Sequence, residues 1–227
     1  MATTVVKKYG IAPYYDDFDE TKNYHRILFR PGHAVQAREL TQLQTALQAQ
    51  IDRYGQFAFK DGSRVVDGKA TLNVEYDFIK IESSFTHSTA GSLNADDYLS
   101  EFVGTTITGA TNGVTAEVLQ AVGVAGSDPN TLYIRYTNSG TNNTTSTFAA
   151  GEEIVSNGSP VRYGMIGGGS NIDGSNTASS ISTPTGKGSA INIEEGVYFI
   201  SGTFIQVPAG SLILDKYTNT PDYIVGL

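Results

Sequence analysis

The segment from His33 to Tyr54 constrains the fold more than any other stretch, because it carries sustained helical periodicity. Its apolar residues recur at spacings of three and four, which places them on one stripe of a helix. Gly55 follows the last periodic residue, where a helix C-terminus favours a residue with positive φ. We therefore predict one long N-terminal amphipathic helix over residues 33–55, about 30 Å in length.

The apolar stripe of this helix has two explanations, and the sequence leaves both open. If the stripe is assigned to a heptad repeat, it spans only about two repeats and contains one glutamine. Such a seam predicts self-association of the helix. Alternatively, the helix packs on a sheet of its own subunit. The candidate self-association residues are Leu40, Leu43, Leu47, Gln50, Ile51 and Tyr54.

Residues 1–32 are typical of an extended aromatic attachment arm. Tyrosine buries a large area while keeping a polar tip, so rings interleaved with charges can lie across a neighbouring surface. The residues predicted to dock on a partner are Tyr9, Tyr14, Tyr15, Phe18, Tyr24 and Phe29. The acidic residues between Asp16 and Glu20 lack the spacing of a calcium-binding EF-hand loop, which favours a solvated turn or a helix N-terminus.

After the helix, the periodicity changes to that of strands. Residues 56–101 and 189–227 alternate apolar and polar positions, which predicts a discontinuous host β domain. Residues 102–163 contain short alternating strands between Gly, Asn and Pro turns, which predicts an inserted small β-barrel or sandwich. Residues 164–188 form a Gly/Ser-rich linker. Because the chain ends on the strand-like YIVGL, we expect either a partner at that edge or a natural chain that continues past Leu227.

Composition and charge exclude several classes of function. Residues 1–60 carry eight Lys or Arg against six Asp or Glu, and the remainder carries seven against 17, which gives a net charge of −8. An acidic body argues against nucleic-acid binding. The sequence contains no cysteine, which excludes disulfides and thiolate metal sites. No apolar run approaches the roughly 18 residues of a membrane span, so we predict no membrane insertion and assembly in a cytoplasm.

The ionisable residues do not form a recognisable catalytic motif. His25, His33 and His87 lie far apart, and none is part of an HExxH pattern. The acidic pairs are adjacent in sequence, so their members point to opposite faces of a strand, whereas glycoside hydrolysis needs two converging carboxyls. These pairs are Asp96–Asp97, Glu152–Glu153 and Glu194–Glu195. We predict no enzymatic activity, no cofactor and no metal site, with a depolymerase site shared between distant strands or subunits as an open alternative.

Two parts of the chain resemble a known class of proteins. Residues 14–65, with the phrase LFRPGHAVQARELTQLQ, closely resemble the N-terminal module of virion structural proteins of contractile-tailed bacteriophages, particularly cyanophages. Near the other end, GVYFISGTFIQV and LILDKYTNTPDYIVGL are similar to the same proteins. Such proteins are described as tail-fibre-like or baseplate-associated. Fibre-like phage proteins are commonly homotrimers, so the resemblance implies a threefold axis at the helix seam.

The resemblance implies a non-enzymatic virion protein that joins a tail fibre or fibre-like appendage to the baseplate. The expected partners are two further copies of the chain, other baseplate or tail proteins, and a distal fibre protein. The expected location is the phage tail, after assembly in the host cytoplasm. The complete fold prediction is mainly β, with the long helix, the host domain, its inserted barrel or sandwich, and a trimeric, fibre-like form. The alternative function is a receptor-binding module for host-surface glycan, which predicts Tyr133 or Tyr136 in a shallow exposed groove.

Overall fold

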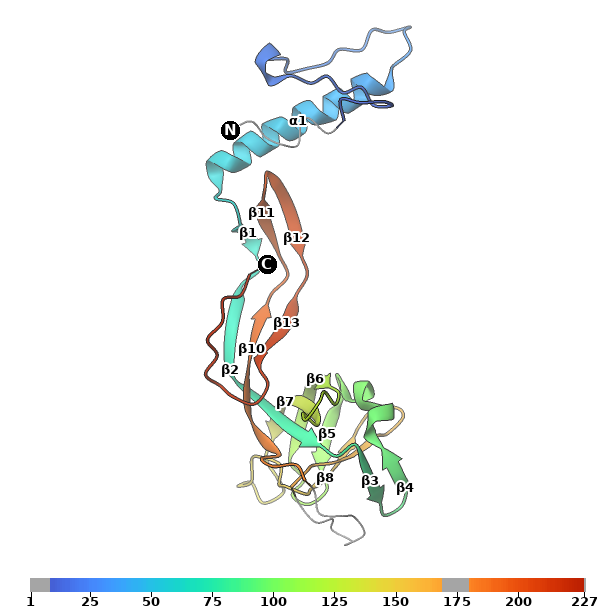
Figure 1. Cartoon of the computed structure of the whole chain (residues 1–227), viewed down its shortest axis with the longest axis vertical. Coiled ribbons are helices and arrows are strands. Elements are labelled where there is room, and N and C mark those ends of the chain that lie inside the picture. Colours follow the sequence, from blue (N-terminus) through green and yellow to red (C-terminus); the bar gives the residue numbers. More distant parts are fainter. Residues whose placement is uncertain (1–8, 169–179, 227) are drawn as a thin grey trace. The chain divides into compact units, whose positions relative to one another are not determined.

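The computed structural model describes residues 9–168 and 180–226, which divide into two compact units (Figure 1). The helix unit comprises Met1–Ala70 and Ile193–Gly210, and the sheet unit comprises Thr71–Asn192 and Ser211–Leu227. Each unit therefore combines stretches that lie far apart in the sequence.

The helix unit consists of an arm, one α-helix and a three-stranded antiparallel sheet of order β1-β11-β12. Its elements are the 3₁₀ turn η2 (Glu20–Lys22), α1 (Ala37–Ala58), β1 (Ser63–Asp67), β11 (Gly196–Ile200) and β12 (Thr203–Val207). The N-terminus of α1 is capped, because the Gln36 backbone N–H donates to Glu39 Oε2 at 3.0 Å in a capping box. The cap explains why the helix begins at Ala37.

The C-terminal end of α1 packs on the β11–β12 hairpin. A Cβ at Gly55 would overlap the ring of Phe199, so the absence of a side chain at this position lets the helix approach the strand. The Phe59 ring, just after the helix, lies 6.0 Å from that of Phe199 and 5.9 Å from that of Phe204, measured between centroids. These three rings form an aromatic cluster in which Phe199 is buried and Phe204 stays partly accessible.

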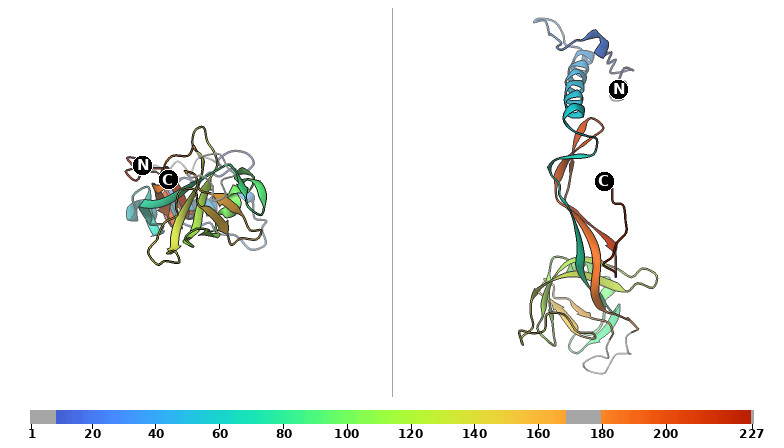
Figure 2. Two further views of the ribbon diagram at one scale, coloured as in Figure 1. Left: turned by 90° about the horizontal axis from the view of Figure 1, so that it is seen from below. Right: turned by 90° about the vertical axis from the view of Figure 1, so that its left-hand side faces the viewer.

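The sheet unit is built on one eight-stranded sheet of order β13-β10-β2-β7-β6-β5-β8-β9 and a separate β3-β4 hairpin. Figure 2 shows the strands of this unit from two further sides. The strands are β2 (Ala70–Ile81), β3 (Ser84–His87), β4 (Gly91–Asn94), β5 (Thr106–Gly109), β6 (Thr115–Val122), β7 (Asn130–Asn138), β8 (Glu153–Ser156), β9 (Tyr163–Met165), β10 (Thr185–Ile193) and β13 (Gly210–Asp215). Two 3₁₀ helices, η3 (Ala95–Asp97) and η4 (Leu99–Phe102), follow β4.

The sheet curls around the larger of two apolar cores. An isolated antiparallel bridge pairs Ile166, just after β9, with Ile81 at the end of β2. Phe102 and Ile107 are fully buried inside the curve, together with Ile81 and Leu132. Successive strand residues point to opposite faces, so the curved face encloses Ile79 and Ile81 of β2 and Leu132 and Ile134 of β7.

The opposite face of β2 and β7 carries a smaller aromatic core. Tyr76 and Tyr133 stack with ring centroids 5.1 Å apart, and Phe78 meets Tyr133 edge-on. The strand register pairs Phe78 with Tyr133 directly, so these rings lie side by side across the ladder. Ala190 of β10 completes the cluster.

The predicted fold class is wrong in its helical part. The chain is mainly β, and among the described residues its single α-helix is α1, at Ala37–Ala58 instead of 33–55. It follows an arm of non-helical chain and is therefore not a long N-terminal helix. The reason is local: residues 33–36 lie outside the helix because the capping box places Gln36 at its boundary.

The predicted inserted barrel or sandwich is also wrong as a separate unit. Residues 102–163 contribute β5–β8, but β7 pairs with β2, so these strands belong to one sheet with the expected host segments. The edge of β7 needs a hydrogen-bonding partner, and that partner is β2, which lies outside the predicted insert. Residues 169–179 of the predicted linker lie outside the described residues, and its flanks include β9 and the start of β10.

Because this core is enclosed, a substitution that leaves a cavity in it should lower the stability of the protein strongly. Ile107→Ala on β5 removes a fully buried side chain and should lower the free energy of unfolding by about 2–5 kcal/mol. Leu119→Ala on the neighbouring strand β6 removes an exposed side chain and should change it by about 0.5 kcal/mol or less. Urea unfolding measures both, and equal losses would contradict this core.

Candidate functional site: the helix and its arm

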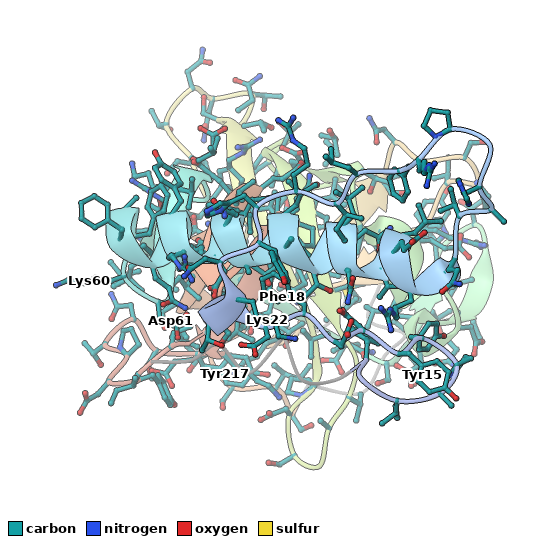
Figure 3. The ribbon with its side chains drawn as sticks, turned by 90° about the horizontal axis from the view of Figure 1, so that it is seen from above. Tyr15, Phe18, Lys22, Lys60, Asp61 and Tyr217 are labelled. Carbon is teal, nitrogen blue, oxygen red and sulfur yellow. The ribbon has the colours of Figure 1, made fainter. Side chains whose placement is uncertain are left out.

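The arm lies along its own helix (Figure 3). Asp16 is only 4% exposed, and its carboxylate accepts hydrogen bonds from the Thr45 hydroxyl and from the Phe18 backbone N–H. Two ion pairs add to this contact, with Arg38 Nε 3.7 Å from Asp17 Oδ1 and Arg53 Nη2 3.1 Å from Glu20 Oε2. Both pairs are largely solvent-exposed and contribute little, so the buried Asp16–Thr45 hydrogen bond anchors the arm.

The buried face of α1 is small or polar. It consists of Thr45, Ala49, Asp52 and Gly55. These residues leave room for the arm backbone and for the hairpin, which larger side chains would displace. The leucine stripe consequently does not form the intramolecular contact of the helix.

The predicted self-association residues form an apolar row that the described chain leaves mostly uncovered. Leu40, Leu47 and Ile51 are about half exposed, Tyr54 is 67% exposed, Gln50 is exposed, and Leu43 is half-buried. Phe57 is 90% exposed and extends the row by one further step of three. Sequence reasoning missed Phe57 because its position beyond Gly55 assigned it to the strand region. Its spacing from Tyr54 was the available signal.

The predicted docking residues point their rings to solvent even though the arm is anchored. Five of the six are exposed, and Phe18 is half-buried beside Ala46 and Ala49 of α1. The exposed rings are those of Tyr9, Tyr14, Tyr15, Tyr24 and Phe29, and the exposed Leu28 adds to them. The backbone of the arm is therefore held by the helix while most of its aromatic side chains stay accessible.

An open groove of about 640 Å³ runs between the arm, α1 and the β11–β12 hairpin. Tyr9 and Tyr14 line it from the arm, in an edge-to-face pair with centroids 5.8 Å apart. Asp52 lines it from α1 and Phe204 from β12. Sequence reasoning did not find this groove, because its walls come from three separate segments.

The acidic residues of the arm have separate partners. Asp16 bonds Thr45, and Asp17 and Glu20 face arginines of α1. Asp19 caps η2, and hydrogen bonds from the Thr21 hydroxyl and backbone lower the pKa of its carboxyl. No cluster of three metal-ligating side chains occurs within residues 9–168 and 180–226.

The histidines and acidic pairs have separate contacts. His87 Nε2 lies 3.0 Å from Glu153 Oε1, and its Nδ1 accepts hydrogen bonds from the backbone N–H groups of Thr89 and Ala90. His25 Nδ1 is 3.5 Å from Gln50 Nε2, and the His33 backbone N–H donates to the Arg30 carbonyl at 3.3 Å. The carboxylate of Glu152 is buried and accepts three backbone hydrogen bonds, from Thr111, Asn112 and Ala149. Glu195 contacts Gln206, and the Asp96 side chain contacts Asn130.

The two tyrosines expected in a glycan groove belong to the cores instead. Tyr133 is fully buried, and burial raises the pKa of its hydroxyl above its usual range. Tyr136 packs against Phe148, and burial raises the pKa of Tyr136 to about 12. Neither ring lies in the predicted exposed groove.

Comparison with known proteins gives one family match. Residues 12–113, just under half of the chain, are similar to a family described as a domain of unknown function, DUF4815. That range contains α1 and all the predicted docking residues except Tyr9. No curated protein and no solved structure matches the chain. Among the described residues, no helix combines the length and apolarity needed to cross a membrane.

Removal of one hydroxyl should release the arm. Thr45→Val keeps the shape of the side chain but leaves the buried Asp16 carboxylate with one hydrogen-bond donor fewer. This should weaken the docking of the arm on the helix by about 1–3 kcal/mol of free energy. Hydrogen exchange at the Phe18 and Asp16 amides should then accelerate by about tenfold or more. Thr41→Val is the matched control, because the Thr41 hydroxyl bonds Ala37 within the helix. Equal exchange in both variants would contradict the anchor.

Proposed function

We propose that the chain is a non-enzymatic structural protein of a phage tail, which joins a fibre or fibre-like appendage to the baseplate. In this proposal the row from Leu40 to Phe57 joins copies of the chain, and the exposed rings of the arm contact neighbouring tail proteins. No cofactor takes part. The protein assembles in the host cytoplasm and ends in the virion.

The observation that carries the proposal is the uncovered apolar row of α1. Large apolar side chains stand at intervals of three and four along five turns of the helix, while the arm and hairpin occupy a different face. Burial of a leucine-sized side chain contributes about 1.5–3 kcal/mol, so several such side chains favour association. An identical helix has the same spacing and is therefore a suitable partner. The expected number of copies, three, comes from the resemblance to fibre-like phage proteins.

Two further features support a role in assembly. Strand β13 is at the edge of the eight-stranded sheet, and β12 is at the edge of the small sheet. Unpaired edges can accept a strand from another protein, such as a distal fibre. Association of this kind uses apolar burial and backbone hydrogen bonds, and it needs no reactive group.

The mass of the protein in solution tests self-association. We expect light scattering to give three times the mass of the chain. Leu47→Glu combined with Tyr54→Glu places two carboxylates in the row, where burial without a partner is costly, and should give a folded monomer.

The control for this test is Gln44→Glu combined with Gln48→Glu, which adds the same charge at exposed positions beside the row, with Gln44 one turn from Leu40 and Gln48 farther from the row. This variant should remain a trimer, at a cost of a few tenths of a kcal/mol in helix stability. A wild-type monomer, or equal effects of the two double variants, would overturn the assignment of the row.

A further inference from the structure

The groove beside α1 has the dimensions of an extended peptide. Its helix wall runs from Thr41 to Asp52, which corresponds to about 16 Å at 1.5 Å per residue. Tyr14 of the arm and Phe204 of the hairpin contribute rings to its other walls. A strand rises about 3.3 Å per residue, so a segment of roughly five residues fits along it.

The side chains along the groove can recognise a polypeptide backbone. Gln44 and Gln48 lie one helical turn apart on its helix wall, and both are exposed. Each amide offers a donor and an acceptor, which a peptide group can match with its own acceptor and donor. The rings of Tyr14 and Phe204 add apolar surface for side chains of the bound segment.

Asp52 places a carboxylate without a cation in the groove. The residue is 6% exposed, and the hydrogen bond to its Oδ1 comes from the neutral Gln56 amide at 2.9 Å. No Lys or Arg among residues 9–168 and 180–226 forms an ion pair with it. Gly202 of the hairpin turn lines the same groove and packs closely against Asp52 Oδ1, the oxygen that also accepts the Gln56 hydrogen bond. Buried charges are normally paired, which makes a basic side chain the complementary ligand.

We infer that this groove binds an extended segment of a partner protein and that an Arg or Lys of the segment pairs with Asp52. An arginine suits the site best, because its fork of N–H donors can bond a carboxylate while the guanidinium plane lies against an aromatic ring. The inference rests on the docking half of the proposed function and specifies its chemistry. It does not depend on the apolar row, so failure of the trimer test and failure of the groove test are distinguishable.

Peptide titration tests the inference on the intact chain. The probe is a capped pentapeptide of alternating alanine and valine that ends in arginine, and the comparison peptide ends in citrulline, the neutral isostere of arginine. The side-chain amide NMR signals of Gln44 and Gln48 report binding. We expect saturable shifts with the arginine peptide and about tenfold or more weaker binding of the citrulline peptide.

Two variants connect the binding to Asp52. Asp52→Asn keeps an acceptor for Gln56 but removes the charge. It should lower the affinity for the arginine peptide to that for the citrulline peptide. Residue 48 lies one helical turn before Asp52, so Gln48→Arg places the chain's own guanidinium in the groove. This variant should fold but no longer bind the arginine peptide, which the side-chain amide signal of Gln44 would report. Equal affinity for the two peptides, no saturable shift, or unchanged binding by a folded Gln48→Arg variant would overturn the inference.

Discussion

The small and polar face of α1 is the constraint on which the helix unit depends. Thr45 gives the arm a buried hydrogen bond at Asp16, and Gly55 admits the Phe199 ring of the hairpin. Close packing of the arm and hairpin leaves no space for leucine side chains on that face, so they lie elsewhere on the helix. The same arrangement therefore holds the unit together and leaves its apolar row available for another surface.

The sheet unit joins strands from distant parts of the sequence in one sheet. Strand β2 pairs with β7, and the alternation of side chains on both strands supplies one core on each face of the sheet. Tyr133 shows the consequence most clearly, because its buried ring packs against Tyr76 and Phe78 of β2 and its hydroxyl donates to the Lys216 carbonyl at 3.3 Å. Aromatic residues in this unit stabilise the body of the protein, whereas most of those in the arm remain at its surface.

The proposed contacts of the helix unit involve different faces of α1. The row at Leu40, Leu47 and Tyr54 would join copies of the chain, and the groove at Gln48 and Asp52 would bind a partner segment. Ile51 lies at the border, since it belongs to the row and also lines the groove. A single helix can thus take part in self-association and in docking at the same time, which is the requirement for a protein that joins two parts of a larger assembly.

The sequence by itself determined the local features: a periodic segment near residues 33–55, an aromatic arm, and alternating strands after them. Such features depend on neighbours three, four or two residues away, and these can be read along the chain. Only the tertiary structure decided that Thr45 and Asp52 are buried while Leu40 and Leu47 are exposed, that β2 joins the strands of residues 102–163 in one sheet, and that Tyr133 is a core residue. Each of these outcomes depends on which distant segment, the arm, the hairpin or a host strand, covers a given surface. Periodicity shows that one face of a helix or strand differs from the opposite face, but it does not show which other segment of the protein covers that face.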